Sequence, residues 1–294
     1  MIQSHRWCSI WARLVFLMCF LSLTLSLSFS EATWAADDFV IFGEEGVWIK
    51  RDSVVVSGDV GANSASTGPF LNEGVEVSLE ANVRMESSTT RVFGNRVSLM
   101  NHTQVFGVQT NALSENGTVH GQVITPLDLP VITTFPQDPK ITTTTLTVEV
   151  PALTTHVLDE WSYDKLIVRS GATLILSGGL YEFSEMKLEN NVRLVIEAST
   201  ELRVVGRMMV GSLVHIGPAE ESSWTAADLL IVVAGINGSS GSLTDFPKAV
   251  TVGSGANVQA NVSVPNGTLE VQRNSSVVGA LLGKWVMVGE QTSV

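Results

Sequence analysis

Cysteine is almost absent from this 294-residue chain, which contains only Cys8 and Cys19. Both lie within the first 35 residues, so no disulfide can form in the remainder, although an exported protein could use one. Stability over residues 36–294 must therefore come from buried apolar side chains and from backbone pairing.

Long apolar runs are also scarce. The run from Leu14 to Leu27 is shorter than the roughly 20 residues that a membrane span needs. Positively charged residues precede the run, at His5, Arg6 and Arg13. A cleavage site after Ala35 would have small residues at its −3 and −1 positions. We therefore predict that residues 1–35 are a secretory signal peptide and that the protein is secreted or on the cell surface. No stable membrane span is then expected after cleavage, and a retained anchor is the alternative.

Basic residues are few, with 17 Lys and Arg against 29 Asp and Glu. Removing residues 1–35 takes away Arg6, Arg13 and Glu31, which leaves 15 basic and 28 acidic side chains and a net charge of −13. Phosphate contacts need clustered cations, so we expect no nucleic-acid partner. The chain also has no P-loop, dinucleotide fingerprint or calcium-binding repeat, and we predict no cofactor.

A repeat occupies residues 166–216. One pattern occurs there three times: apolar alternation, a short polar break, and apolar alternation again. The breaks contain Ser170, Asn190 and Ser212, which are spaced by 20 and 22 residues. Alternation with a period of two is typical of strands with one buried face, and a fixed period near 20 indicates a repeat architecture. Apolar residues hold the even positions: 166, 168, 172, 174, 176, 186, 188, 192, 194, 196, 208, 210, 214 and 216. We predict an all-β, parallel, right-handed β-helix or solenoid with coils of about 20 residues.

The same pattern recurs on both sides of a proline-rich stretch. Five of the nine prolines fall between Pro126 and Pro151, and proline removes a ladder donor, which excludes central sheet there. We therefore expect a first solenoid segment at 36–125, a Pro/Thr-rich spacer or excursion at 126–157, and a second solenoid segment at 158–294. Gly255 and Asn274 are expected at sharp bends, because both residue types tolerate a left-handed backbone.

Residues 158–290 carry a resemblance. The chain reads Val168-Arg-Ser-Gly171-Ala-Thr-Leu174-Ile-Leu176-Ser-Gly-Gly179-Leu-Tyr181-Glu-Phe183, and later Val264-Pro-Asn-Gly267-Thr, Gly279-Ala280 and Gly283-Lys284-Trp-Val286-Met-Val288. In these motifs it resembles a family of secreted bacterial parallel β-solenoid domains of unassigned function. Through Gly58-Asp-Val60-Gly61 it is more distantly similar to ice-binding β-solenoids.

The resemblance implies a surface or extracellular role, because members of the family occur alone or in envelope and pilus-associated proteins. It supplies no catalytic residues. The chain departs from the family at Asp159-Glu-Trp-Ser-Tyr163, where members usually have a Pro-Gly-Thr-Tyr turn, so an irregular start to the second segment is expected.

The candidate ligand-binding residues lie in and next to this same segment. Carboxylates beside aromatic rings suit a sugar, and such a group is formed by Asp159, Glu160, Trp161, Tyr163 and Asp164. A solvated loop explains the same residues equally well, and we assign no catalytic residue. The histidines outside the signal peptide show no metal-ligand spacing, so no metal site is predicted; they are His102, His120, His156 and His215.

These observations favour a non-enzymatic structural or adhesive protein of the cell surface or extracellular matrix. Its expected partners are polysaccharide, other envelope proteins or further copies of itself. Self-assembly is expected at the last coil, where Trp285, Val286, Met287 and Val288 would form an uncovered sheet edge. One alternative is a polysaccharide-binding or polysaccharide-cleaving β-helix protein, which needs a groove with convergent carboxylates. Another is an ice-binding protein, which needs a flat, threonine-rich face.

Overall fold

A computed structural model describes residues 39–64, 74–132 and 145–294. Over these ranges the protein is all-β and its strand pairs are parallel, and the strands form three sheets. The predicted signal peptide lies outside the described residues. Within the described ranges, no helix is long and apolar enough to cross a membrane.

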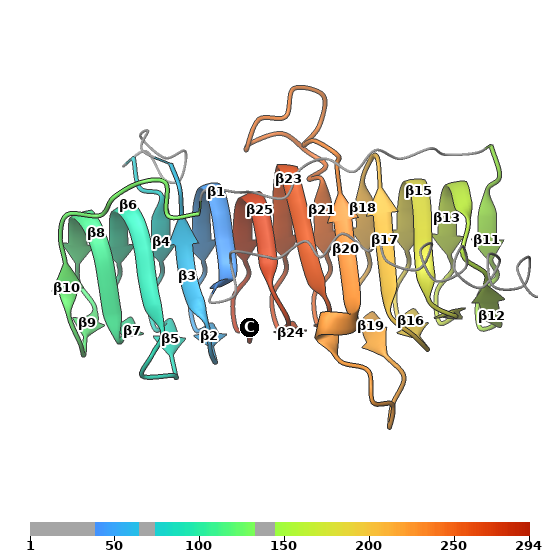
Figure 1. The fold of residues 1–294 in the computed structure, drawn as a ribbon, viewed down its shortest axis with the longest axis horizontal. Coiled ribbons are helices and arrows are strands. Elements are labelled where there is room, and N and C mark those ends of the chain that lie inside the picture. Colours follow the sequence, from blue (N-terminus) through green and yellow to red (C-terminus); the bar gives the residue numbers. More distant parts are fainter. Residues whose placement is uncertain (1–38, 65–73, 133–144) are drawn as a thin grey trace, which may run out of the picture. The chain divides into compact units, whose positions relative to one another are not determined.

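Sheet 1 has fifteen strands, and Figure 1 shows them side by side. Twelve follow one path, in the order β10 (Val123–Ile124), β8 (Gly107–Glu115), β6 (Arg91–Leu99), β3 (Asp59–Ala62), β1 (Phe39–Ile49), β25 (Leu281–Val288), β23 (Asn261–Val271), β20 (Leu229–Val233), β17 (Thr200–Val204), β15 (Gly179–Leu188), β13 (Ser162–Val168) and β11 (Val148–Val150). Three pair beside this path, namely β4 (Val77–Leu79), β18 (Met208–Val210) and β21 (Val250–Val252).

Two smaller sheets complete the fold. Sheet 2 has six strands in the order β12 (Thr155–Leu158), β14 (Thr173–Leu176), β16 (Arg193–Ile196), β19 (His215–Pro218), β22 (Asn257–Gln259) and β24 (Ser276–Val278). Sheet 3 has four, in the order β2 (Val54–Val55), β5 (Arg84–Met85), β7 (Gln104–Val105) and β9 (Thr118–Val119). Ser293 bridges Ser276 of sheet 2 and Val54 of sheet 3. One short 3-10 helix, η1 (Ala226–Asp228), precedes β20.

The chain does not fill sheet 1 in sequence order. From β1 it moves outward through β3, β6 and β8 to β10; it then resumes with β11 at the opposite end and returns to β25. There β25 pairs with β1 from Ile41↔Leu281 to Ile49↔Val288, with a register shift between Gly43 and Gly46. The two predicted segments, 36–125 and 158–294, therefore share one sheet.

This pairing corrects the predicted assembly edge. Trp285, Val286, Met287 and Val288 lie in β25, which has β1 on one side and β23 on the other. The prediction assumed that the last strand in the chain would be the last in the sheet. The backbone groups of β25 are instead used in ladders on both sides, and the end strands of the described sheet 1 are β10 and β11.

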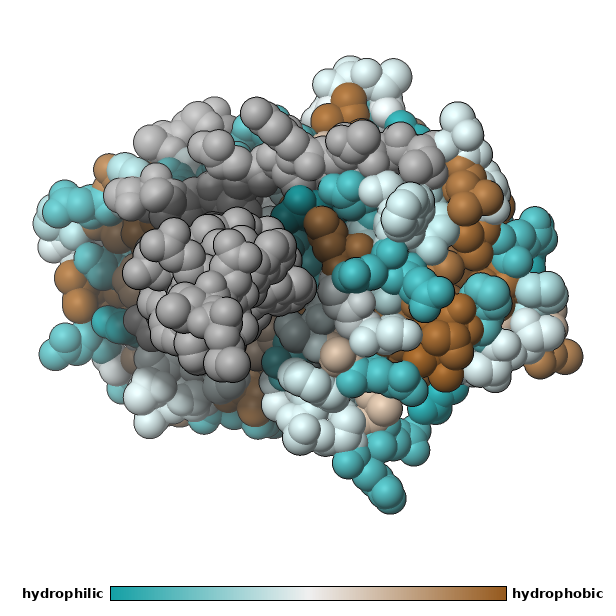
Figure 2. All heavy atoms as spheres, turned by 45° about the vertical axis from the view of Figure 1, so that its right-hand side comes forward, coloured by the Kyte–Doolittle hydropathy of each residue, from teal (hydrophilic) through white to brown (hydrophobic). Residues whose placement is uncertain are grey.

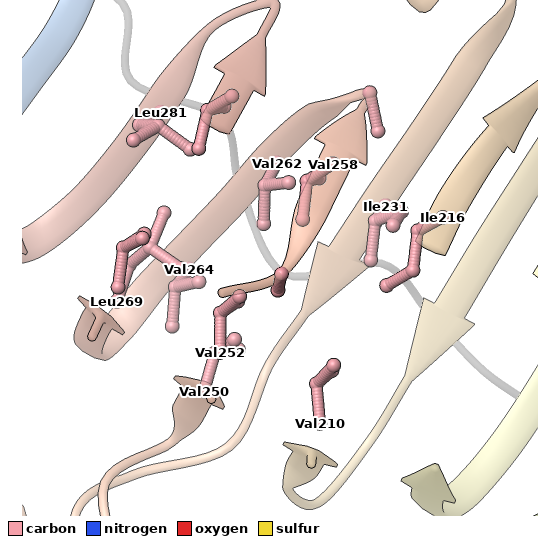
Figure 3. Packing of buried hydrophobic residues seen from close by; sticks show 14 of the residues in the cluster. Val210, Ile216, Ile231, Val250, Val252, Val258, Val262, Val264, Leu269 and Leu281 are labelled. Carbon is pink, nitrogen blue, oxygen red and sulfur yellow. The ribbon is translucent and has the colours of Figure 1, made fainter. Parts of the chain in front are cut away.

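The predicted alternation is confirmed at the core. Every even apolar position of the three repeats is buried, and side chains from sheets 1 and 2 point toward one another, as Figure 3 shows for Val210 and Ile231 of sheet 1 and Ile216 and Val258 of sheet 2. Equivalent positions form columns across the strands. Leu166 pairs with Met186, Met186 with Met208, and Met208 with Val250. Each buried side chain of this kind stabilises the fold by about 1.5–3 kcal/mol relative to leaving it exposed.

The polar breaks of the repeat form the corners between sheets 1 and 2. Gly171, Asn191 and Leu213 have φ of 71°, 59° and 57°, and the predicted bends Gly255 and Asn274 have φ of 70° and 59°. A Cβ at position 255 would lie 2.8 Å from Cδ2 of Leu213 on the neighbouring corner, but that exposed side-chain end can shift, so the positive φ is what favours glycine there.

The predicted spacer is only partly right. Strand β11 and all of β12 but its last residue fall within 126–157. The two strands lie at the ends of sheets 1 and 2, where Val150 supplies a core residue and β12 pairs along β14. Near the start of the spacer, two residues are each bound by an asparagine from outside the spacer, through two hydrogen bonds to the backbone. Asn111 holds Leu127 at 2.9 and 3.1 Å, and Asn63 holds Ile132 at 2.7 and 3.0 Å. Residues 133–144 lie outside the described residues.

Candidate functional site

The predicted ligand-binding residues lie in the connection from β12 to β13 and at the start of β13. Asp159 and Glu160 are exposed, Trp161 is 64% exposed, and Asp164 is half-buried. Figure 2, which turns this side of the molecule forward, shows apolar groups in brown set among hydrophilic ones in teal. The structure therefore places four of the five predicted residues where solvent reaches them.

Tyr163 does not belong to this surface. Its side chain is 6% exposed and stacks on Phe183 at 5.6 Å between ring centroids, and its hydroxyl donates to the Asp159 carbonyl at 3.0 Å. Burial raises the pKa of the Tyr163 phenol, with a smaller contribution from the charge of Asp159. The prediction was wrong for this residue, because the strand's inward face changes from odd to even positions between Tyr163 and Leu166.

Tyr181 holds the same connection from the next strand. Its hydroxyl donates to the Leu158 carbonyl at 2.9 Å, and burial raises its pKa. The chain has two tyrosines, and both therefore fix the backbone of residues 158–159. Their hydroxyls have a structural use here, and the irregular start of the second segment is anchored by them.

A polar network lies beside the connection on β13, β15 and β17. Ser162 donates to Glu182 at 2.8 Å, and Arg203 lies 3.8 Å from Glu182 and 2.7 Å from Glu201. Ser162, Glu182 and Arg203 are register partners on successive strands. Glu182 is only 9% exposed, and its carboxylate has its hydrogen-bond and ion-pair partners within the sheet.

A second ladder runs along the corner after sheet 1. Arg169 donates to Glu149 and Glu189, each at 2.8 Å, and Glu189 also accepts from Ser170 at 3.2 Å. The Arg169 guanidinium holds the pKa of the Glu189 carboxyl below its ordinary value, and the two carboxylates raise the pKa of Arg169. Lys187 adds an ion pair to Glu189 at 3.5 Å.

The histidines are dispersed over the fold. His102 is at an exposed corner, His120 is close to Phe106, and His156 is exposed in β12. His215 lies on the outer face of sheet 2, where burial lowers its pKa, helped by the charge of Arg193. Among the described residues, no group of three His, Cys, Asp or Glu side chains could hold a metal ion.

The outer face of sheet 2 tests the threonine array that an ice-binding protein needs. One register row crosses all six strands and contains, in order, Thr155, Thr173, Arg193, His215, Asn257 and Ser276. Threonine therefore occupies the first two strands of this row, and arginine, histidine, asparagine and serine take its place in the four strands that follow.

Two cavities that the sequence did not indicate lie along the corner that follows sheet 1. One, of about 290 Å³, is lined by the ends of β23 and β25 and by the corner residues that follow β1, β23 and β25, including Lys50, Glu270, Gln272, Arg273, Met287 and Glu290. The other, of about 380 Å³, lies near the ends of β15 and β18 and is lined by Ser170, Lys187, Glu189, Asn190 and Met209 among others. No sequence motif marks the residues that line these cavities, because only the strand register brings them together.

Neither a scan against protein-family models nor a search of curated proteins returns a match to this chain.

Proposed function

We propose that the protein is an exported parallel β-solenoid that acts as a non-enzymatic structural or adhesive protein of the cell surface or extracellular matrix. The observation that carries this is the ladder of parallel strands in which the first and last strands of the described residues, β1 and β25, pair with each other. Such a ladder joins almost the whole described chain into one scaffold.

The solenoid interpretation is supported by the strand path. The chain passes from β13 in sheet 1 through a corner to β14 in sheet 2 and back to β15, one step along sheet 1. Register partners on successive coils are 20 residues apart for Leu166↔Met186 and 22 apart for Met186↔Met208. Parallel crossovers of this kind are right-handed by the general rule.

The non-enzymatic interpretation is supported by how the acidic side chains are used. Glu182 and Glu189 are paired with arginines within ladders. The exposed Asp159 and Glu160 lie in a connection whose backbone at residues 158–159 accepts hydrogen bonds from both tyrosine hydroxyls. A glycosidase instead positions a carboxylate pair on either side of a bond. Export is supported by the pattern of residues 1–35 and by the resemblance to secreted bacterial solenoids.

Product analysis on immobilised and soluble polysaccharides tests the proposal directly. Residues 36–294, which form one unit, would be incubated with a panel of plant, fungal and bacterial polysaccharides, followed by chromatography of released oligosaccharides. The proposal predicts no release above a buffer control. Release that is lost in an Asp159→Asn, Glu160→Gln, Asp164→Asn triple variant would overturn it.

A further inference from the structure

The two corner cavities lie along one line. One row of register partners passes through both of them: Lys187↔Met209, Met209↔Thr251, Thr251↔Glu270, Glu270↔Met287 and Met287↔Trp48. Lys187 and Met209 line the larger cavity and Glu270 and Met287 the smaller one, while Thr251 lies between the two cavities in the row and Trp48 ends it. This row, which we call the corner row, crosses β15, β18, β21, β23, β25 and β1. Five strand steps of ~4.8 Å make it about 24 Å long.

The corner row depends on the junction of the two halves of the chain. Lys50 follows β1 and lines the same cavity as Met287 and Glu290 of the carboxyl-terminal end. It is placed there by the β1–β25 pairing, in which the Lys50 amide donates to the Val288 carbonyl at 2.9 Å. Arg51 forms an ion pair with Glu290 at 3.2 Å across the same junction.

The charges lining the cavities balance. The smaller cavity has Lys50 and Arg273 against Glu270 and Glu290, and the larger has Lys187 against Glu189. The whole chain, by contrast, has a net charge of −12. A balanced lining gives no preference to a phosphate or to a divalent cation, and it favours an uncharged ligand that both donates and accepts hydrogen bonds.

The remaining lining suits a chain of sugar rings. Gln272, Asn190 and Ser170 offer amide and hydroxyl groups, while Met209 and Met287 offer flexible thioether surfaces that adapt to an apolar ring face. At one end of the row stands Trp48, whose Nε1 donates to Glu80 at 2.8 Å and whose ring lies 4.9 Å from Lys50 Nζ. A sugar ring of an extended glycan advances by about one strand spacing, so ring and strand repeats can run together.

We infer that the corner row binds a linear, uncharged polysaccharide lengthwise, with the glycan crossing the strands. This rests on the proposed adhesive function and names its ligand class. The site is distinct from the 159–164 connection. It uses side chains from six strands, so it exists only in the folded stack.

Calorimetric titration with hexasaccharides tests the inference. The probes are cellohexaose, chitohexaose and xylohexaose, with a hexagalacturonate as the charged comparison, each added to residues 36–294. We expect at least one uncharged probe to bind and the charged one to bind at least about tenfold more weakly. Met287→Arg should fill the smaller cavity and weaken binding by about tenfold or more.

Matched variants separate a lost site from a lost fold. Val278→Arg places the same side chain on an exposed position of sheet 2, 55% exposed, and should leave both melting temperature and affinity unchanged. If Met287→Arg does not fold, Gln272→Ala with Arg273→Ala removes two exposed lining groups without adding bulk, and a loss of affinity is again expected.

The outcomes also distinguish this inference from the proposed function. If no uncharged hexasaccharide binds, or if Met287→Arg and the double alanine variant bind like the parent, the corner row is not the site and the inference fails while the non-enzymatic proposal stands. If the hexasaccharides are bound and cleaved, the proposed function fails.

Discussion

The two halves of the fold build the wall opposite sheet 1 differently. In the carboxyl-terminal half this wall is sheet 2, with strands of three or four residues; in the amino-terminal half it is sheet 3, with strands of two. Directly after its corners, the former half has buried apolar residues at Ala172, Val192, Val214 and Ala256, and a buried hydroxyl at Ser275. The latter has Val83 after one corner and Ser53 and Thr103 after two others, and these two hydroxyls donate to the Gly289 and Glu80 carbonyls.

The residue after a corner affects how many apolar side chains the following strand buries, and the shorter strands of sheet 3 bury fewer. Where the first inward position is apolar, the strand contributes three buried apolar side chains in the carboxyl-terminal half, as at Val192, Leu194 and Ile196, and two at β5, namely Val83 and Met85. Where it is a hydroxyl, the side chain turns back to the corner backbone and fewer apolar groups are buried. We therefore expect the amino-terminal half to open before the carboxyl-terminal half, with the junction of β1 and β25 limiting the separation of the two.

The largest effect should come from breaking the junction. Val286 is fully buried between Leu269 and Val47, so Val286→Asp would place an unpaired carboxylate in the central column. We expect a loss of about 4 kcal/mol or more in the free energy of unfolding, measured by guanidinium titration. Met287→Asp, one residue further on the outward face, should cost about 1 kcal/mol or less. Equal effects at the two positions would contradict the register.

Core truncation on either side of the junction sharpens the comparison. Leu194 is fully buried between Leu174 and Ile216, whereas Met85 is 3% exposed in a two-residue strand. Both substitutions to alanine fall in the range of about 2–5 kcal/mol. Leu194→Ala should lie near the top of that range and Met85→Ala near the bottom, because narrow walls relax more easily. The same chemical denaturation measures both, and the reverse order would refute the wider-core interpretation.

The smallest effect concerns acid sensitivity at the corners. The carboxyl-terminal half links its corners through Arg169 and Glu189, whereas Asn82 donates to Asp52 at 2.8 Å in the amino-terminal half. The Glu189 carboxyl has a folded pKa below its ordinary 4.5. It therefore stabilises the fold above pH 4.5, and this contribution is lost as the pH falls through the lowered value.

Arg169→Gln should remove that contribution. The melting temperatures of parent and variant are expected to differ slightly at pH 7 and to converge toward pH 3, because the pair is exposed and screened by solvent. An Asn82→Ala variant, whose bond does not involve arginine, is the control for the other half. A difference between parent and Arg169→Gln that grows on acidification would contradict the assigned pair.

Local features of the fold were readable from the sequence because they depend on neighbouring residues. Alternation predicted which side chains of residues 166–216 face the core, and Gly255 and Asn274 were placed at bends with positive φ. Tyr163 was misplaced because a parity change between it and Leu166 leaves no mark in composition.

The features that sequence reasoning placed wrongly depend on the order in which strands lie side by side in sheet 1. Trp285 and Val288 were assigned to an edge because the chain ends near them, yet the return from β11 brings them against β1. The corner row was missed for the same reason. Its side chains are Lys187, Met209, Thr251, Glu270, Met287 and Trp48, and no sequence spacing joins the last of these to the others.

The pairing of β1 with β25 is the central claim, and a disulfide tests it most directly. Residues 36–294 contain no cysteine, so Trp48→Cys with Met287→Cys introduces a single pair at register partners on adjacent strands. Neighbouring strands about 4.8 Å apart lie within the Cα range of a disulfide. We predict that mild oxidation of the dilute protein yields an intramolecular crosslink, seen as a mobility shift that reductant reverses. Free thiols or only intermolecular crosslinks would contradict the pairing.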